Sequence, residues 1–416
     1  MAMAGHGIRG VMERKKGMNM TCKVARIWLW TLGIAGLWMT CAWGAPSGGG
    51  SSVVVNGVWH PTRQDFYASS QFRAESRRCG TMMRNPSLNE LRRKRAKADP
   101  SDCTSTRTAI QDTYWPTQAL SIRVVVHVIH REDGTGNVDD DRIARQIEVL
   151  NEDYTALAGS LGEQGFDAKI RFVLAGITRT ANNEWHEDAD ESAYKEALAW
   201  DVSRYCNVYV NTAGGYLGYA YFPQDDVGKL DGLVISYDAF GGRDEGSNPY
   251  DQGRTTVHEM GHYLGLYHTF EGYSDCLNTY TNGDLIVDTP AESTDHYGCE
   301  PSTTCGTDDP IRNYMNYTDD ACMREFTPEQ ANRMVCALTS YRSGLMETYP
   351  FDVQPLAIWK SAGPVGGPFL PTGTVYAVSN GAAVSIEWTA SATQPWLAVT
   401  PASGTLRQGN TEPVMI

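Results

Sequence analysis

Three short apolar runs in the first half of the chain have the pattern of β-strands. Residues 124–129 are a run of β-branched residues interrupted only by His127, as expected of a buried strand. Residues 170–174 place apolar side chains at every second position, and residues 207–210 form a third run. The pattern predicts three strands, with His127 as a hydrogen-bonded histidine of the core.

A helical pattern separates the first two of these runs. Asp139 and Asp140 are suited to cap a helix N-terminus, and apolar positions follow them at intervals of three or four. Strands that alternate with a helix predict a right-handed βαβ unit and a mainly parallel sheet. The glycine-rich residues 214–220, followed by residues 231–235, predict an edge strand that an extended peptide can pair with. The apolar helix positions are Ile143, Ile147, Leu150 and Tyr154.

The composition shifts after Pro350 to glycine, proline, valine, threonine and tryptophan. Residues 383–388 alternate apolar and polar positions, and residues 396–401 follow at turn spacing. We expect an immunoglobulin-like β-sandwich module over residues 350–416, with contact to a surface or a carbohydrate as its candidate role. Because such a sandwich needs roughly 100 residues and only 67 are present, the module is expected to stop partway.

The N-terminal stretch has the pattern of a signal peptide. Basic residues precede an apolar run of 13 residues, 27–39, and small residues follow near Gly44. This run is shorter than the ~20 residues of a membrane-spanning helix. We therefore expect removal of residues 1–44 and secretion of a mature chain without a transmembrane anchor.

The overall composition agrees with export. The chain has 35 basic and 49 acidic residues and a net charge of −14, which makes nucleic acid a poor partner. Its ten cysteines would be unusual in a reducing compartment unless they bound metal. The composition therefore favours a secreted globular protein with disulfides.

Residues 258–268 carry the motif H-E-x-x-H-x-x-G-x-x-H. On a helix, residues four apart share a face, so His258 and His262 can direct two imidazoles at one metal ion. Glu259 lies beside them and is free to act as the base that takes a proton from water. The pattern predicts the active site of a zinc enzyme.

Gly265 and His268 complete this motif. Glycine reaches the left-handed backbone conformation easily, so Gly265 can end the helix and turn the chain back. His268 can then serve as the third zinc ligand. Three protein ligands leave one tetrahedral position for water, as in catalytic rather than structural zinc sites.

Residues 45–106 are expected to be a propeptide. Within it, the sequence 77–81 is Arg-Arg-Cys-Gly-Thr, in which Cys79 is suited to bind zinc as a thiolate and to exclude water. The alternative is a disulfide, most simply with Cys103. The basic run 92–95 is expected to be a solvated, protease-sensitive linker.

Two further motifs follow the zinc ligands. Residues 283–292 read Gly-Asp-Leu-Ile-Val-Asp-Thr-Pro-Ala-Glu, and residues 313–322 read Asn-Tyr-Met-Asn-Tyr-Thr-Asp-Asp-Ala-Cys. With the zinc motif, they resemble the pappalysin family of metzincin metallopeptidases over about residues 79–341. The resemblance implies an α/β (α+β) catalytic domain at 107–345. It has a twisted, mainly parallel sheet, an active-site helix above the cleft and an irregular, disulfide-linked lower subdomain.

The resemblance also implies roles for three residues of the second motif. Met315 would lie in a tight turn beneath the metal, as packing and not as a ligand. Tyr317 would donate its phenol hydrogen to the oxyanion. Asp320 would lie at the base of the pocket that receives the side chain after the scissile bond, where a carboxylate selects Arg, then Lys.

A calcium loop and two disulfides are implied as well. The sequence alone permits three pairings of the four cysteines concerned, and it gives no warrant for pairing Cys206 with Cys336. The implied disulfides are Cys276–Cys305 and Cys299–Cys322. The implied ligands of a structural Ca²⁺ are the side chain of Asp284 and the carbonyls of Gly283, Ile286 and Thr289.

These features together predict a secreted zinc endopeptidase, made as a zymogen, that cleaves proteins or peptides before Arg. Self-cleavage at Thr106–Arg107 would then give a mature N-terminus at Arg107. The alternative is a catalytically retired surface-binding protein that uses its β-sandwich tail. Retention of Glu259 and the three histidines argues against that alternative.

Overall fold

The computed structural model divides into two units, residues 1–63 and 64–416, each described by itself. The predicted signal segment 1–44 and the basic run 92–95 lie outside the described residues. In the first unit, β1 (Val53–Val55) and β2 (Val58–His60) form an antiparallel hairpin. The described residues are 52–55, 57–75, 77–81, 99–242, 248–272, 276–347, 351–354, 370–380, 385–392, 397–407 and 410–416.

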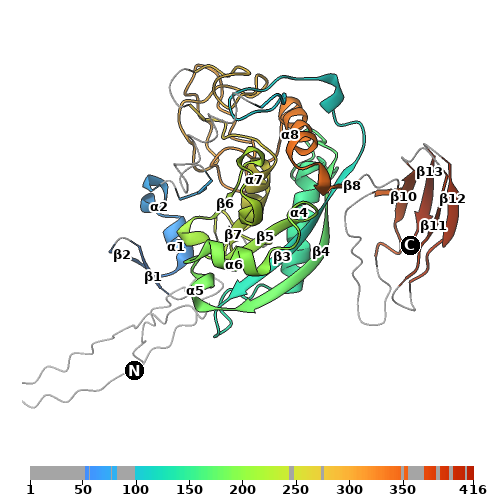
Figure 1. Ribbon diagram of the computed structural model, residues 1–416, viewed down its shortest axis with the longest axis horizontal. Helices are drawn as coiled ribbons and strands as arrows, with labels where there is room; N and C mark the ends of the chain where they lie inside the picture. The colour runs from blue at the N-terminus through green and yellow to red at the C-terminus, as the bar shows by residue number, and fades with distance from the viewer. Residues whose placement is uncertain are drawn as a thin grey trace, which may run out of the picture. The chain divides into compact units, whose positions relative to one another are not determined.

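A twisted sheet forms the centre of the second unit (Figure 1). Its order is β4-β3-β5-β7-β6, and the first four of these strands run parallel. The predicted parallel sheet is therefore confirmed, and β6 lies at its edge as an antiparallel strand. The strands are β3 (Leu120–His130), β4 (Ile170–Ala181), β5 (Cys206–Asn211), β6 (Gly218–Ala220), β7 (Leu233–Ser236) and the short β8 (Met346–Glu347), which pairs with β3.

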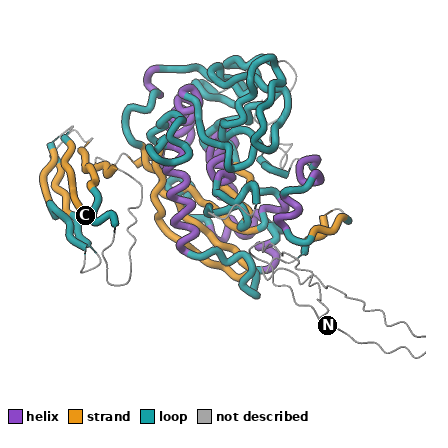
Figure 2. Tube along the Cα trace, turned by 180° about the vertical axis from the view of Figure 1, so that it is seen from behind, coloured by secondary structure: helices purple, strands orange, loops and turns teal. Residues whose placement is uncertain are grey.

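Alternation along β3 divides the core between the two faces of the sheet. Val124, Val126 and Val128 join a large cluster with residues of α4 (Asp140–Tyr154), α7 (Arg254–Tyr263) and α8 (Pro328–Tyr341). The neighbouring Ile129 faces a second cluster with α6 (Glu191–Leu198). Helices therefore cover both faces, and Figure 2 shows the long helices beside the strands from behind. Shorter helices are α1 (Arg63–Tyr67), α2 (Ser70–Ala74) and α5 (Asn183–His186).

The predictions for α4 and His127 are confirmed. Asp139 caps α4 by accepting a hydrogen bond from the backbone N–H of Arg142. His127 is fully buried, stacks on Tyr209 and makes hydrogen bonds to Thr178 and Asn207. Burial lowers its pKa to about 4, so it is a neutral core residue.

The segment between α7 and α8 is irregular and is held by disulfides. The structure contains Cys276–Cys305 and Cys299–Cys322, the pairs that the resemblance implied. A third disulfide joins Cys103 to Cys336 of α8. It excludes the alternatives of a Cys79–Cys103 pair and a Cys206–Cys336 pair, because Cys79 and Cys206 are free.

The C-terminal residues form two small antiparallel sheets around an apolar core of Val378, Trp388, Leu406 and Val414. Among the described helices of the whole chain, none is long and apolar enough to cross a membrane. The strands are β9 (Phe351–Gln354), β10 (Val375–Asn380) and β13 (Thr411–Met415) in one sheet, and β11 (Ile386–Thr389) and β12 (Ser403–Leu406) in the other.

Candidate active site

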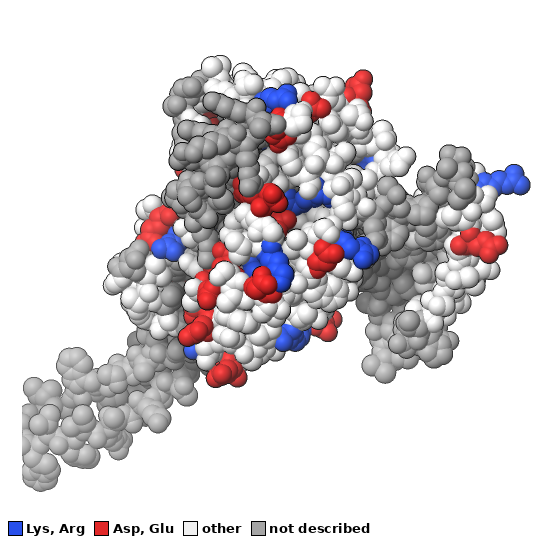
Figure 3. Space-filling view, viewed as in Figure 1, with Lys and Arg blue, Asp and Glu red and all other residues white. Residues whose placement is uncertain are grey.

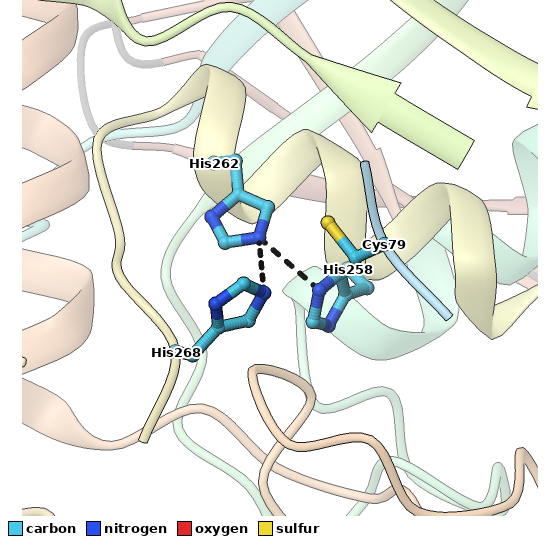
Figure 4. A group of neighbouring side chains, drawn as sticks. All are labelled: Cys79, His258, His262 and His268. Atoms are coloured by element: carbon cyan, nitrogen blue, oxygen red, sulfur yellow. Dashed lines mark hydrogen bonds between the residues drawn. The ribbon is translucent and has the colours of Figure 1, made fainter. Parts of the chain in front are cut away.

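Three histidines converge at the C-terminal half of α7 and the turn that follows it (Figure 4). His262 Nε2 lies 3.1 Å from His258 Nε2 and 3.0 Å from His268 Nε2. The Sγ of Cys79 joins them, so that the four ligand atoms lie within 4.8 Å of one another, all on buried residues. Three imidazoles and a thiol form the donor set that zinc prefers.

The hydrogen bonds of the histidines leave their Nε2 atoms available to a metal. The Nδ1–H of His258 donates to Tyr314 O and that of His262 to Leu266 O, both at 2.7 Å. Such bonds fix the tautomer and the orientation of the ring. Burial lowers the pKa of His268 to about 3 and holds the pKa of His258 well below its usual value, an effect that the neighbouring His262 increases. Both rings are therefore neutral, the form that binds zinc.

Gly265 makes the turn that the motif predicts. Its φ is +94°, in the left-handed region, and α7 ends just before it. A side chain at this position would also approach the Cβ of Ala337 to 3.2 Å. The turn brings His268 back to the other two histidines.

Glu259 lies beside the converging histidines and is fully buried. Its Oε2 accepts hydrogen bonds from Thr81 Oγ1 (2.8 Å) and Cys79 Sγ (3.4 Å), whereas its Oε1 has no hydrogen-bond partner. Burial raises the pKa of Glu259 to about 7, against the opposing effect of the Thr81 bond. A carboxylate with one free oxygen and a pKa near neutrality is suited to take and return a proton.

Comparison with known proteins agrees with this geometry. Residues 189–339 match the family described as pregnancy-associated plasma protein-A. An extracellular metalloprotease of Pyricularia oryzae is 38% identical over 238 residues, covering 54% of this chain and 77% of that protein. An extracellular metalloprotease of Colletotrichum graminicola is 39% identical over 236 residues, covering 54% of this chain and 78% of that protein. The chain belongs to the pappalysin family.

This pappalysin is therefore a zinc metallopeptidase that acts on protein or peptide substrates. Among solved structures, mature mirolysin of Tannerella forsythia with a cleaved peptide is 34% identical, with a TM-score of 0.46, covering 55% of this chain and 96% of that chain. A promirolysin mutant from the same organism is 30% identical, with a TM-score of 0.49, covering 65% of this chain and 97% of that chain. Residues 375–415 match a family described as the viral BACON domain.

Met315 lies directly beneath the active-site helix of this pappalysin. A Cβ built on Gly261 would come within 2.3 Å of the Met315 sulfur, so any side chain at that position would have to displace Met315. Met315 is fully buried, as expected of packing. The sequence analysis did not identify a role for Gly261. The two middle positions of H-E-x-x-H can be any residue in the motif, and only the structure shows that Met315 packs against one of them.

Tyr317 packs against the ligand cluster. Its ring centroid lies 4.9 Å from that of His268, 4.7 Å from that of Phe270 and 5.8 Å from that of His258. The residue is 5% exposed. The structure thus brings Tyr317 to the site where the sequence placed it.

Asp320 and Arg78 are both fully buried and form an ion pair. Arg78 Nη2 is 3.4 Å from Asp320 Oδ1, its Nη1 donates to Thr255 Oγ1 (2.7 Å), and its guanidinium lies over the ring of Tyr250. Burial raises the pKa of Asp320 to about 6, opposed by Arg78. The backbone N–H groups of Gln252 and Arg254 donate to its other oxygen. Thr255 and Tyr250 were not predicted.

Residues 77–81 pair with the edge strand of the sheet. The N–H of Leu217 donates to Arg77 O (3.1 Å), and the N–H of Gly80 donates to Gly218 O (2.9 Å). Thr81 Oγ1 accepts a further bond from the N–H of Ala220 (3.0 Å). The segment therefore contacts β6 and the preceding Leu217 through main-chain hydrogen bonds and runs in the same direction as the strand.

The implied calcium loop places one carboxylate in a buried position. Asp284 is 1% exposed and accepts hydrogen bonds from Ile286 N (3.0 Å) and Thr289 Oγ1 (2.6 Å). Burial raises its pKa to about 8. Gly283 has a φ of +70°, and the carbonyl of Thr289 accepts a bond from Asn278. A bound cation would compensate the charge of Asp284.

Proposed function

We propose that this pappalysin is exported as an inactive zymogen and matures into an endopeptidase that cleaves before arginine. The observation that carries the proposal is the convergence of the three histidines, Cys79 and the free oxygen of Glu259. The names of the extracellular relatives support export.

The three histidines His258, His262 and His268 would hold one zinc ion. When bound there, zinc supplies Lewis-acid activation of the attacking water and of the scissile carbonyl. Glu259 takes the proton of the water and returns it to the amine that leaves.

Other residues orient the substrate and stabilise developing charge. Tyr317 donates its phenol hydrogen to the oxyanion. β6 pairs with the extended substrate backbone, because its outer edge is open once residues 77–81 have left. Asp320 forms a charge-assisted hydrogen bond with a substrate guanidinium, and its pairing with the guanidinium of Arg78 supports this role.

Latency follows from the same contacts. Cys79 lies beside the three histidines and would take the position of the attacking water, Thr81 donates to Glu259, and Arg78 pairs with Asp320 and would block the proposed specificity pocket. Because these three residues belong to one short segment, its removal would release the metal position, the base and the pocket together.

Cleavage-site mapping tests the activity itself. The matured protein is incubated with a peptide library, with and without a zinc chelator, and the products are identified by mass spectrometry. We expect chelator-sensitive cleavage with arginine, and less often lysine, after the scissile bond. Hydrophobic residues dominating that position would contradict the pocket assignment.

Replacing Cys79 with alanine is expected to shorten the lag before the zymogen becomes active. Water could then reach the metal without displacing a thiolate. The lag is measured by continuous peptide hydrolysis after mixing with a fixed amount of matured enzyme. Cys206→Ala is the control, because Cys206 is the other free, buried cysteine among the described residues. An equal lag in both variants would argue against the switch.

Calcium removal is expected to lower the melting temperature of the protein. A site that binds Ca²⁺ only in the folded state stabilises it by about 2.7 kcal/mol when the ion is at 100 times its Kd. Melting is followed during calcium titration in a buffer that spares zinc. The variant Asp284→Asn should lose the response. A wild-type melting temperature that does not respond to calcium would exclude this site.

A further inference from the structure

Residues 103–108 are built into the catalytic domain. Cys103 is fully buried and forms its disulfide with Cys336 of α8. Gln224 Nε2 donates to Cys103 O (2.8 Å), and the N–H of Thr108 donates to Tyr280 O (2.7 Å). We call residues 103–108 the arm. It precedes the segment that leads into β3 (Figure 1).

A buried arginine connects the arm to the zinc-binding turn. Arg333 of α8 is fully buried, and its Nε donates to Gly265 O (2.7 Å). Its other nitrogens donate to Thr104 O (2.8 Å) and Arg107 O (3.1 Å). Arm carbonyls on both sides of the Thr106–Arg107 bond therefore help to hold the guanidinium that fixes Gly265.

A second contact reaches the same turn. Tyr267 donates its hydroxyl hydrogen to Ser105 O (3.1 Å), and its ring stacks on Phe222 at 4.8 Å. Phe222 in turn packs edge-on against the ring of His262 at 5.4 Å. Gly265 and Tyr267 both lie between His262 and His268, so the arm contacts the turn at two points.

We infer that the arm stays in the mature enzyme, where it positions the turn between the second and third zinc ligands. The cut that frees Cys79 from the catalytic domain then falls before Cys103. This inference rests on the proposed zymogen function and moves the catalytic domain boundary from Arg107 to a point before Cys103. Arg333 and Tyr267 act as positioning residues.

Hydrolysis at Thr106–Arg107 would not release the inhibitory segment. That reaction consumes one water and leaves a carboxylate on Thr106 and an amine on Arg107. The fragment that ends at Thr106 would still be joined to α8 through Cys103 and Cys336. Earlier bonds are available, because the sequence between Thr81 and Cys103 contains four arginines.

The first test maps the matured chain. The zymogen is matured by itself or, in parallel, by trypsin, and it is analysed by N-terminal sequencing and by intact mass before and after reduction. We expect an N-terminus that precedes Cys103 and no fragment released by reduction. An N-terminus at Arg107, or at Thr108 in the trypsin sample, or a fragment ending within the arm that reduction releases, would overturn the inference. The trypsin sample tests the arm even if self-processing, and with it the proposed activity, is absent.

The second test measures zinc affinity by competition with a chelating indicator on matured protein. Arg333→Lys keeps the positive charge but loses the planar guanidinium that bonds to Gly265 O and to the arm carbonyls at the same time. We therefore expect zinc to bind at least about tenfold more weakly. Tyr267→Phe removes only the hydroxyl group and is expected to weaken zinc binding about two- to tenfold. This variant is the test of the positioning role if Arg333→Lys does not fold. Arg324→Lys is the control, since the side chain of Arg324 contacts only Ala321 O in the described hydrogen bonds. Wild-type affinity in a folded Tyr267→Phe would contradict the positioning role.

Discussion

Replacing Glu259 with alanine is expected to lower kcat/KM by about 10³-fold or more while zinc stays bound. General acid–base catalysis contributes about 10²- to 10⁴-fold, and here one residue both takes and returns the proton. The Nδ1–H groups of His258 and His262 donate to backbone carbonyls, so the orientation of these two rings does not depend on Glu259. Zinc content and turnover are measured on the same sample.

The experiment on Glu259→Ala has to separate a loss of catalysis from a failure of the zymogen to mature. An inactive variant cannot process itself, so all variants are matured with the same added protease and checked by intact mass. The control is Glu196→Ala, because Glu196 is exposed and pairs only with Lys229 in the described ion pairs. Retention of activity within tenfold of wild type would mean that Glu259 is not the base. Loss of zinc together with activity would mean that it serves the metal site instead.

The second large effect is expected at Asp320. Its replacement by asparagine keeps an acceptor for the backbone N–H groups of Gln252 and Arg254 and removes the charge. A hydrogen bond to a charged group contributes about 1.5–3 kcal/mol, so kcat/KM for substrates with arginine after the scissile bond should fall about 10- to 150-fold. Substrates with an apolar residue there should change much less.

The pH dependence offers an independent check of this pocket. With Arg78 in place, burial raises the pKa of Asp320 to about 6 against the opposing effect of Arg78, and the carboxylate becomes protonated as the pH falls through that value. The protonated form cannot pair with a guanidinium as an ion. We expect KM for arginine substrates to rise below about pH 6 in the wild type, with a flatter profile in Asp320→Asn. An arginine preference unchanged in the variant would place the specificity elsewhere.

Local sequence patterns were sufficient to predict the strands of the parallel sheet and the three histidines that converge in the site. The strand at Val124 and the helix after Asp139 follow from periodicity, which only requires neighbours along the chain. The fixed spacing from His258 to His268 likewise encodes a helix followed by a turn.

Contacts between distant residues could not be predicted in the same way. Arg78 meets Thr255 across 177 positions, and Cys103 meets Cys336 across 233. Thr81 shows no motif of its own, although it lies two residues after the expected cysteine and engages Glu259. Such pairings depend on how the whole chain folds back, so a single sequence leaves several partners open.

Surface charge on the catalytic domain is locally balanced. On the face drawn in Figure 3, acidic and basic side chains are interspersed. Arg131 pairs with Glu187 (2.9 Å), and Arg145 pairs with Glu152 (2.7 Å). The Arg131–Glu187 pair is exposed and the Arg145–Glu152 pair is partly so, and surface pairs contribute about 0–1 kcal/mol each and weaken with salt. The stability of the domain therefore has to come mainly from its core and its covalent links.

The Cys103–Cys336 disulfide has a consequence for the unfolded chain. It closes a loop of 233 residues, which takes in nearly the whole catalytic domain. A cross-link of this span restricts the conformations of the unfolded ensemble and stabilises the folded state by about 2–5 kcal/mol. That contribution is retained only where thiols stay oxidised, so the domain should withstand heat and denaturant better outside the cell than in a reducing cytoplasm.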